Sequence, residues 1–163
     1  MSLENFYIYT DGSCKGNPGP GGWAAILLHN ETEKPFQILK GNEADTTNNR
    51  MEMIAVIEAL RYIHENHLQN NIITLHSDSN LVIQTLTSGW KRKANLDLWE
   101  ELDELNEELT VTYLWVRGHG KNKWNNECDK IAVAESAKAQ KKNSSTSPRK
   151  SSLKKSTEQG RLF

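Results

Sequence analysis

The sequence predicts an α/β domain in which a five-stranded mixed sheet is flanked by helices. Three apolar runs joined by tight connections lie within residues 6–43, which is typical of an antiparallel meander. Beyond them the pattern continues as helix, strand, helix, helix, strand, helix. A meander followed by this alternation favours strands of both orientations in one sheet, with helices packed on its faces.

The meander consists of three predicted strands, residues 6–13, 23–29 and 36–43. Asp11 lies at the end of the first strand, and a turn rich in glycine and proline, residues 14–22, follows it. Glycine permits positive φ angles and close approach of another backbone or a ligand, whereas proline stiffens the turn. A surface aspartate of an ordinary hairpin is one interpretation. Because aspartate is disfavoured within strands, we treat Asp11 as a site residue.

Apolar spacing predicts the remaining elements. Residues 48–66 carry an apolar stripe close to helical spacing, with Asn66 as the end of the helix. Residues 72–76 form a short apolar run, which indicates a buried strand. The other predicted elements are helices at 80–86, 97–109 and 124–139 and a fifth strand at 111–116.

Composition indicates one folded domain and a basic tail. A chain of 163 residues with 36% hydrophobic residues is long enough for one domain with a core. Residues 1–137 hold 12 basic and 20 acidic residues, whereas residues 138–163 hold 8 basic and 1 acidic. The tail has few large apolar residues, so burial cannot offset the entropy lost on ordering. We therefore expect a catalytic domain at 1–138 and a disordered tail at 139–163.

The sequence contains no sign of a membrane segment. No stretch reaches the roughly 18 apolar residues that a membrane helix needs, and the start lacks the features of a signal peptide. We expect a cytoplasmic protein. Cys14 and Cys128 lie in different predicted elements and match no zinc spacing, which favours reduced thiols. No exposed apolar stripe demands a second copy, so we expect a monomer.

Three further acidic residues join Asp11 as candidate ligands. Glu52 lies near the start of a predicted helix with apolar neighbours at i+3 and i+4, where a carboxylate costs several kcal/mol without a cation or donor. Asp78 follows the buried strand directly, and Asp129 lies in the first turns of the last helix. Taken singly, Asp78 or either flanking serine suits a helix N-cap, and Asp129 suits the helix dipole.

Four carboxylates brought together without Lys or Arg between them repel one another unless cations intervene. Hard oxygen ligands select Mg²⁺ or Mn²⁺ over zinc. Paired ions about 4 Å apart recur in phosphoryl-transfer enzymes, where one activates water and the other stabilises the leaving oxygen. The four carboxylates therefore favour a two-metal hydrolase.

Five local strings resemble those of the type 1 ribonuclease H family. In chain order they are Thr10-Asp11-Gly12-Ser13 with Gly16-Asn17-Pro18-Gly19, Thr47-Asn48-Asn49-Arg50-Met51-Glu52, Ser77-Asp78-Ser79, Trp115-Val116-Arg117-Gly118-His119, and Asn126-Glu127-Cys128-Asp129. The resemblance covers residues 6–137. It implies a ribonuclease H-like fold and hydrolysis of the RNA strand of RNA·DNA hybrids with divalent metal, leaving 3′-hydroxyl and 5′-phosphate ends.

The resemblance also implies a role for each site residue. Asp11 is expected to bridge two Mg²⁺ ions, for which Mn²⁺ can substitute. Asp129 is expected to complete the ion on the nucleophile side, and Glu52 and Asp78 the ion on the leaving-group side. His119, in a loop flanked by glycines, is expected to transfer protons and assist product release, which suits a histidine side chain.

Substrate recognition is expected to use amides in the minor groove, where 2′-hydroxyls mark the RNA strand. By resemblance, Asn17, Asn48, Asn49 and Asn80 approach sugars and base edges. Asn80 stands where relatives usually have glutamine, so its reach is shorter. Asn17 also suits a turn and Asn48 a helix cap, and both roles are compatible with binding.

The segment at residues 88–95 is short, whereas some relatives carry a long basic loop that grips the substrate. Trp90 is followed by three basic residues and is predicted to stack on a deoxyribose while they meet DNA phosphates. Packing of Trp90 on its own domain is the alternative. Because the domain is acidic and its basic loop is short, we expect weak, salt-sensitive binding of the hybrid, to which the basic tail contributes.

The sequence thus predicts a hybrid-specific endoribonuclease. A hybrid-binding module that does not cleave is the alternative, and the presence of all four carboxylates and His119 argues against it. A nuclease or integrase of related fold that acts on DNA is disfavoured, because the string at residues 47–52 is the one that hybrid-reading relatives use.

The last five residues resemble the Gln-x-x-Leu-Phe peptides that dock on bacterial sliding clamps. Gln159, Leu162 and Phe163 occupy the three motif positions. Two apolar anchors on a basic segment are what a groove-binding peptide needs. The alternative is a tail that binds nucleic acid without sequence preference.

A peptide of residues 154–163 is expected to bind a bacterial sliding clamp, because Leu162 and Phe163 supply apolar anchors. Calorimetric titration measures the affinity, and the same peptide with both anchors changed to alanine is the control. No binding at high micromolar peptide would remove the clamp as a partner.

Overall fold

The computed structural model describes residues 3–30 and 34–145 of the chain. Its elements are β1 (Asn5–Cys14), β2 (Gly19–His29), β3 (Gln37–Thr46), α1 (Asn48–Glu65), β4 (Ile72–Ser77), α2 (Asn80–Ser88), α3 (Leu96–Glu108), β5 (Val111–Trp115) and α4 (Lys123–Ser145). Every predicted strand and helix is present in the predicted order. The three residues proposed to bind a clamp, Gln159, Leu162 and Phe163, lie outside the described residues.

All five strands form one mixed sheet in the order β3-β2-β1-β4-β5. The central strand β1 pairs antiparallel with β2 and parallel with β4. On the outside, β3 continues the antiparallel meander and β5 lies parallel to β4. The mixed sheet predicted from the sequence is therefore confirmed.

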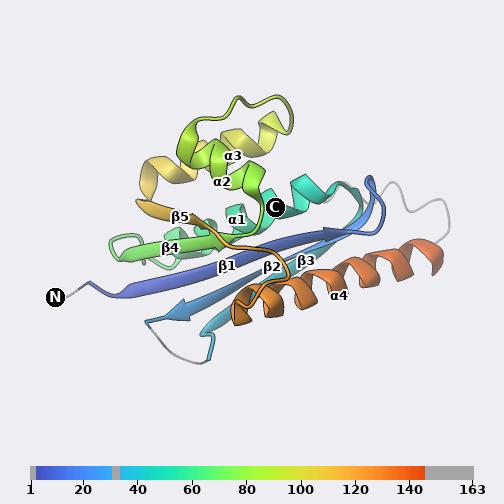
Figure 1. Ribbon diagram of the computed structural model, residues 1–163, viewed down its shortest axis with the longest axis horizontal. Coiled ribbons are helices and arrows are strands. Elements are labelled where there is room, and N and C mark those ends of the chain that lie inside the picture. Colours follow the sequence, from blue (N-terminus) through green and yellow to red (C-terminus); the bar gives the residue numbers. More distant parts are fainter. Residues whose placement is uncertain (1–2, 31–33, 146–163) are drawn as a thin grey trace.

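Helices cover both faces of the sheet (Figure 1). Helices α1, α2 and α3 lie on one side and α4 lies on the other. Side chains alternate along β1, so Ile8 enters the core beneath α1 and α3, whereas Tyr7 and Tyr9 pack toward α4. The sheet is thus the middle layer of three, with a hydrophobic cluster on each side.

The two thiols and the helix lengths agree with the sequence analysis. Cys128 is buried, Cys14 is half-buried, and neither forms a disulfide. Within residues 3–30 and 34–145, none of the helices has the length and apolarity required to cross a membrane.

Hydroxyl side chains cap the two helices that flank the predicted site. Thr47 precedes α1, and its side chain accepts a hydrogen bond from the Arg50 backbone nitrogen at 3.2 Å. The alternative role of Asn48 as a cap is therefore wrong, because Asn48 is already helical. Ser79 caps α2 in the same way, so Asp78 is not the cap of that helix.

The last helix is longer than predicted. The sequence pattern predicts that this helix ends at residue 139 and that the chain is disordered from there on, but α4 continues to Ser145. Ala139 is buried, and the Asn143 side-chain amide donates to the Ala44 carbonyl oxygen in β3 at 2.8 Å. The expectation of disorder is wrong for residues 139–145, because packing on a distant strand stabilises a polar helix end that has little apolar pattern of its own.

A chain ending at Ser145 is expected to be about 1–2 kcal/mol more stable than one ending at Lys138, because the extra turns bury Ala139 and bond to β3. Urea denaturation of the two truncated chains measures the difference in the free energy of unfolding. Identical midpoints and slopes would show that residues 139–145 add nothing to the fold.

Candidate active site

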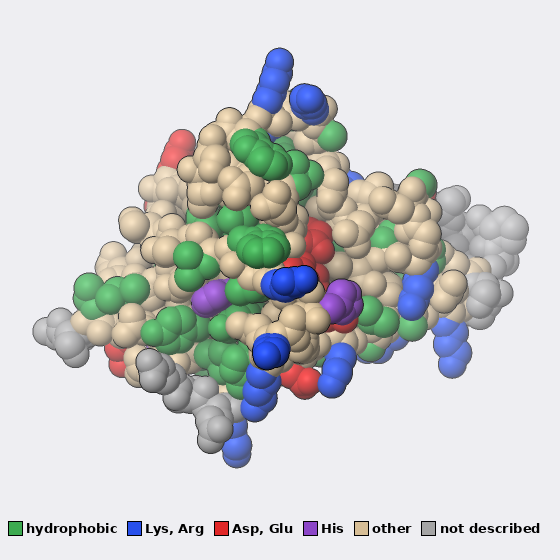
Figure 2. Space-filling model, in the orientation of Figure 1, with side chains coloured by type: hydrophobic (Ala, Val, Ile, Leu, Met, Phe, Trp, Pro, Cys, Tyr) green, Lys and Arg blue, Asp and Glu red, His purple; other side chains and the backbone are tan. Residues whose placement is uncertain are grey.

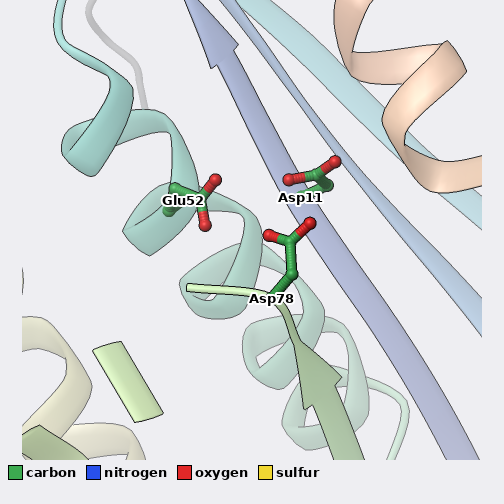
Figure 3. A group of neighbouring side chains, drawn as sticks. All are labelled: Asp11, Glu52 and Asp78. Carbon is green, nitrogen blue, oxygen red and sulfur yellow. The ribbon is translucent and has the colours of Figure 1, made fainter. Parts of the chain in front are cut away.

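Three carboxylates meet at one end of the central strands (Figure 3). Asp11 lies on β1, Glu52 in α1, and Asp78 directly after β4. One oxygen from each residue lies within 4.8 Å of the others. The parallel register places Thr10 of β1 opposite Ser77 of β4. Asp11 follows Thr10 and Asp78 follows Ser77, so the two carboxylates lie at the same level. Sheet register and the position of α1 together build the cluster.

The approach of α1 to β1 depends on Gly12. A Cβ atom at this position would overlap the backbone nitrogen of Glu52 and lie 2.6 Å from the carbonyl carbon of Met51. Any larger residue would push the first turns of α1 away from β1. Glycine at position 12 is therefore what allows Glu52 to lie beside Asp11.

Two of the three carboxylates are buried, and no cation in the described part of the chain pairs with the cluster. Asp11 is 3% exposed and Glu52 is 5% exposed. Burial, followed by the nearby Glu52 and Asp78, holds the pKa of Asp11 well above its usual range. Burial and then Asp78 also raise the pKa of Glu52. None of the ion pairs among the described residues involves these three carboxylates.

Two carboxylate oxygens of the cluster have unused hydrogen-bonding capacity. The Gly12 backbone nitrogen donates to Asp11 Oδ1 at 2.9 Å. Asp11 Oδ2 and Glu52 Oε2 are buried and have no hydrogen-bond partner among the described residues. Such acceptors cost free energy unless something else binds them. An all-oxygen ligand set of this charge fits a hard divalent cation better than zinc.

The fourth predicted carboxylate, Asp129, approaches the cluster from the opposite side of the sheet. It lies half-buried on α4 and outside the group of oxygens within 4.8 Å. The nearby Asp129 side chain adds to the rise in the pKa of Asp11. Its role as a ligand stays a prediction.

Sequence analysis missed one buried residue that contacts the cluster, Asn125. Its side chain is 1% exposed, and its amide nitrogen donates to Asp78 Oδ2 at 3.4 Å. Asn126, which belongs to the family-like string, donates instead to the Gly120 carbonyl oxygen at 3.0 Å. The available signal was the i, i+4 spacing from Asn125 to Asp129, which puts both residues on one face of a helix.

His119 is exposed in the connection between β5 and α4 and has a φ of 54°. The preceding Gly118 packs against the cluster, since a Cβ atom there would lie 2.9 Å from Asp78 Oδ2. The loop that carries His119 is therefore in contact with one of the carboxylates. Its role in proton transfer stays a prediction.

All four asparagines predicted to read the substrate are exposed: Asn17, Asn48, Asn49 and Asn80. The Asn17 side-chain oxygen accepts a hydrogen bond from the Asn48 backbone nitrogen at 3.0 Å, which joins the β1–β2 turn to the start of α1. Asn80 is the first residue of α2 and follows Asp78 by two positions. These residues lie on the same segments as the carboxylates and remain candidate substrate contacts.

Trp90 lines a cavity of about 470 Å³ together with Asn49 and Asn95. Because 46% of Trp90 is exposed, it is not buried within its own domain. The flanking Arg92 pairs with Asp103 at 2.6 Å, so one of the three neighbouring positive charges is already compensated. Contact of Trp90 with a deoxyribose stays a prediction.

This chain is similar in sequence to members of one known protein family. The RNase H family model matches residues 4–137. Ribonuclease H from Thermoanaerobacter sp. (strain X514) is 42% identical over 146 residues, which cover 81% of this chain and 90% of the relative. Ribonuclease H from Acetivibrio thermocellus is 42% identical over 154 residues, which cover 86% of this chain and 100% of the relative.

Solved structures show the same fold. The N-terminal RNase H domain of rv2228c from Mycobacterium tuberculosis aligns with a TM-score of 0.76 at 24% identity, covering 86% of this chain and 99% of that one. LC11-RNase H1, solved in complex with RNA/DNA hybrid, aligns with a TM-score of 0.72 at 22% identity, covering 82% and 98%. The ribonuclease H-like fold is thereby confirmed.

Asp11→Asn is expected to stabilise the metal-free protein, because folding then no longer requires a buried carboxyl to take up a proton, and the side-chain shape is kept. Since the pKa of Asp11 is raised on folding, the unfolded chain releases this proton first, and wild-type stability falls as the pH rises above the ordinary carboxyl range. The gain should grow from about pH 5 to about pH 8 and reach about 1–3 kcal/mol. Urea denaturation in EDTA measures it.

The matched control for Asp11→Asn is Asp97→Asn. Asp97 pairs with Arg50 at 2.8 Å, and this contact lowers the pKa of Asp97, so its replacement should not stabilise the protein at either pH. Excess Mg²⁺ should stabilise the wild type more than the Asp11 variant. A gain from Asp11→Asn that is the same at both pH values would contradict the electrostatic explanation.

Proposed function

Because this chain belongs to the type 1 RNase H family, we propose that it is an endoribonuclease that hydrolyses the RNA strand of RNA·DNA hybrids. The observation that carries the proposal is the convergence of three carboxylates from β1, α1 and the end of β4, none of which pairs with a cation of the described residues. Relatives named ribonuclease H match most of the chain, and a protein of the same fold was solved with an RNA/DNA hybrid. These relatives identify the substrate class that the site is proposed to act on.

The proposed cofactor is a pair of Mg²⁺ ions, with Mn²⁺ as a substitute. Asp11, Glu52, Asp78 and Asp129 would hold them, and the unpartnered oxygens of Asp11 and Glu52 support this assignment. When bound, such ions activate water and stabilise the leaving oxygen. Asp11 is the proposed shared ligand, because Glu52, Asp78 and Asp129 all raise its pKa.

The protein side chains would handle orientation and proton transfer. In the proposed reaction, water attacks the phosphorus and the bond to the 3′-oxygen breaks, which leaves 3′-hydroxyl and 5′-phosphate ends. His119 is proposed to supply the proton to the 3′-oxygen and to move away with the product, since it is exposed on a loop that contacts Asp78 through Gly118.

Selection of the hybrid is proposed to rest on small polar groups around the carboxylates. Asn17, Asn48, Asn49 and Asn80 are exposed on the segments that carry the site, as minor-groove recognition of 2′-hydroxyls requires. Trp90 would meet the DNA strand at the edge of the cavity that it lines. The monomeric state and the clamp contact also remain predictions.

With Mg²⁺, the protein is expected to cut the RNA strand of an end-labelled hybrid and to leave double-stranded and single-stranded RNA intact. Asp11→Asn should lower the rate constant by at least about 100-fold, because Asp11 is the carboxylate that both proposed ion sites share. Gel separation of the labelled products measures cleavage and identifies the ends.

Glu104→Gln is the matched control for this assay, because Glu104 is an exposed carboxylate on α3, outside the site. Full activity of the Asp11 variant would overturn the assignment of Asp11. Tight binding of the hybrid without cleavage in either Mg²⁺ or Mn²⁺ would favour the non-cleaving hybrid-binding module.

A further inference from the structure

The connection between β5 and α4 carries a group of exposed cations. Residues 117–123, here called the cationic segment, contain Arg117, Lys121 and Lys123, and all three are exposed. None of them forms an ion pair with a carboxylate of the described residues. The other arginines in the described ranges each pair with an acidic side chain, namely Arg50, Arg61 and Arg92. Within the described residues, the cationic segment therefore carries positive charge that no carboxylate compensates.

The cationic segment is fixed beside the carboxylate cluster at both ends. Before it, the Val116 backbone nitrogen donates to the Ser77 carbonyl oxygen at 2.9 Å. Within it, Gly118 packs on Asp78, and just after it the Asn125 amide donates to Asp78 Oδ2. The backbone of the cationic segment is consequently held next to Asp78. Figure 2 shows basic side chains next to acidic ones and a histidine at the centre of this face.

The three cations form no ion pair with the cluster among the described residues, although their segment packs on Asp78. Among the described residues, no ion pair joins them to Asp78 or its neighbours, and Lys123 instead lies over the Trp124 ring at 4.7 Å from its centroid. The surrounding domain at residues 1–137 has 8 more acidic than basic residues. A polyanion would be repelled by most of this surface, so exposed cations at the site are where its charge can be compensated.

We propose that Arg117, Lys121 and Lys123 bind phosphate groups of the RNA strand next to the bond that is cut. This inference rests on the proposed function, because the strand held over Asp78 is then the strand that is cleaved. Neighbouring phosphates of that strand are the anions within reach of a segment that packs on Asp78. The contacts fix the strand in register without reading its sequence.

The test is a variant that combines Arg117→Ala, Lys121→Ala and Lys123→Ala. In EDTA, where no cleavage occurs, its affinity for hybrid should fall about 10- to 100-fold at low salt, and the slope of log Kd against log salt should decrease by about 2 to 3. At saturating hybrid and Mg²⁺, kcat should change by less than about threefold, because the segment binds substrate and the carboxylates and His119 are intact. Fluorescence anisotropy measures binding.

The matched control removes the same charge away from both the site and the basic tail, with Lys34→Ala, Lys40→Ala and Arg61→Ala. This variant should lose less than about threefold in affinity, because general charge is changed without touching the site. An equal loss in both triple variants would overturn the proposal, since it would reflect net charge alone. Unchanged affinity and salt slope in the triple variant of the cationic segment would overturn the proposal as well.

Neutral methylphosphonate linkages in the hybrid test which of its two strands the cationic segment binds. Replacing the phosphates that flank the cut site in the RNA strand with methylphosphonates should weaken binding by the wild type. The same replacement should have little further effect on the triple variant of the cationic segment. If only replacements in the DNA strand behave in this way, the assignment to the RNA strand is wrong. Failure of the proposed function would look different, because the wild type would then not cleave the hybrid at all.

Discussion

The close packing of α1 on β1 at Gly12 is the contact on which the site depends. With no side chain at this position, the backbone of Glu52 lies directly against the central strand, next to Asp11. The same strand pairs with β4 in a register that brings Asp78 level with Asp11. One glycine and one register therefore join three chain segments, and each carboxylate is held by backbone structure that a hydrophobic cluster supports on each face of the sheet.

This packing gathers charges that work against folding. Asp11 and Glu52 are buried beside Asp78, their pKa values are raised, and two of their oxygens lack partners among the described residues. The free-energy cost of this site is offset by the packing of the surrounding sheet and helices. Binding of cations to the carboxylates would remove part of that cost and so stabilise the folded protein. Residues 117–123, which pack on Asp78 through Gly118, carry exposed cations that pair with none of these carboxylates among the described residues.

Apolar spacing was sufficient to predict the helices and strands of the described residues in order, because most of them bury a face whose pattern is visible locally. The errors occurred where contacts distant in sequence decide the outcome. Residues 139–145 are helical because Ala139 is buried and Asn143 bonds to β3, and neither contact leaves a local pattern. At the start of α1, Thr47 and Asn48 both suit a cap; Thr47 is the cap, and the Asn48 backbone nitrogen bonds instead to Asn17, which is distant in sequence.

For the site, the sequence by itself determined the candidate carboxylates and the family, because residue types and short strings are local properties of the chain. Only the tertiary structure decided which of them meet. Asp11, Glu52 and Asp78 share one cluster, whereas Asp129 lies outside the 4.8 Å group and Asn125, not Asn126, faces Asp78. The physical reason is that these distances depend on how α1 and α4 pack on the sheet, and packing is set by contacts between segments far apart in the sequence.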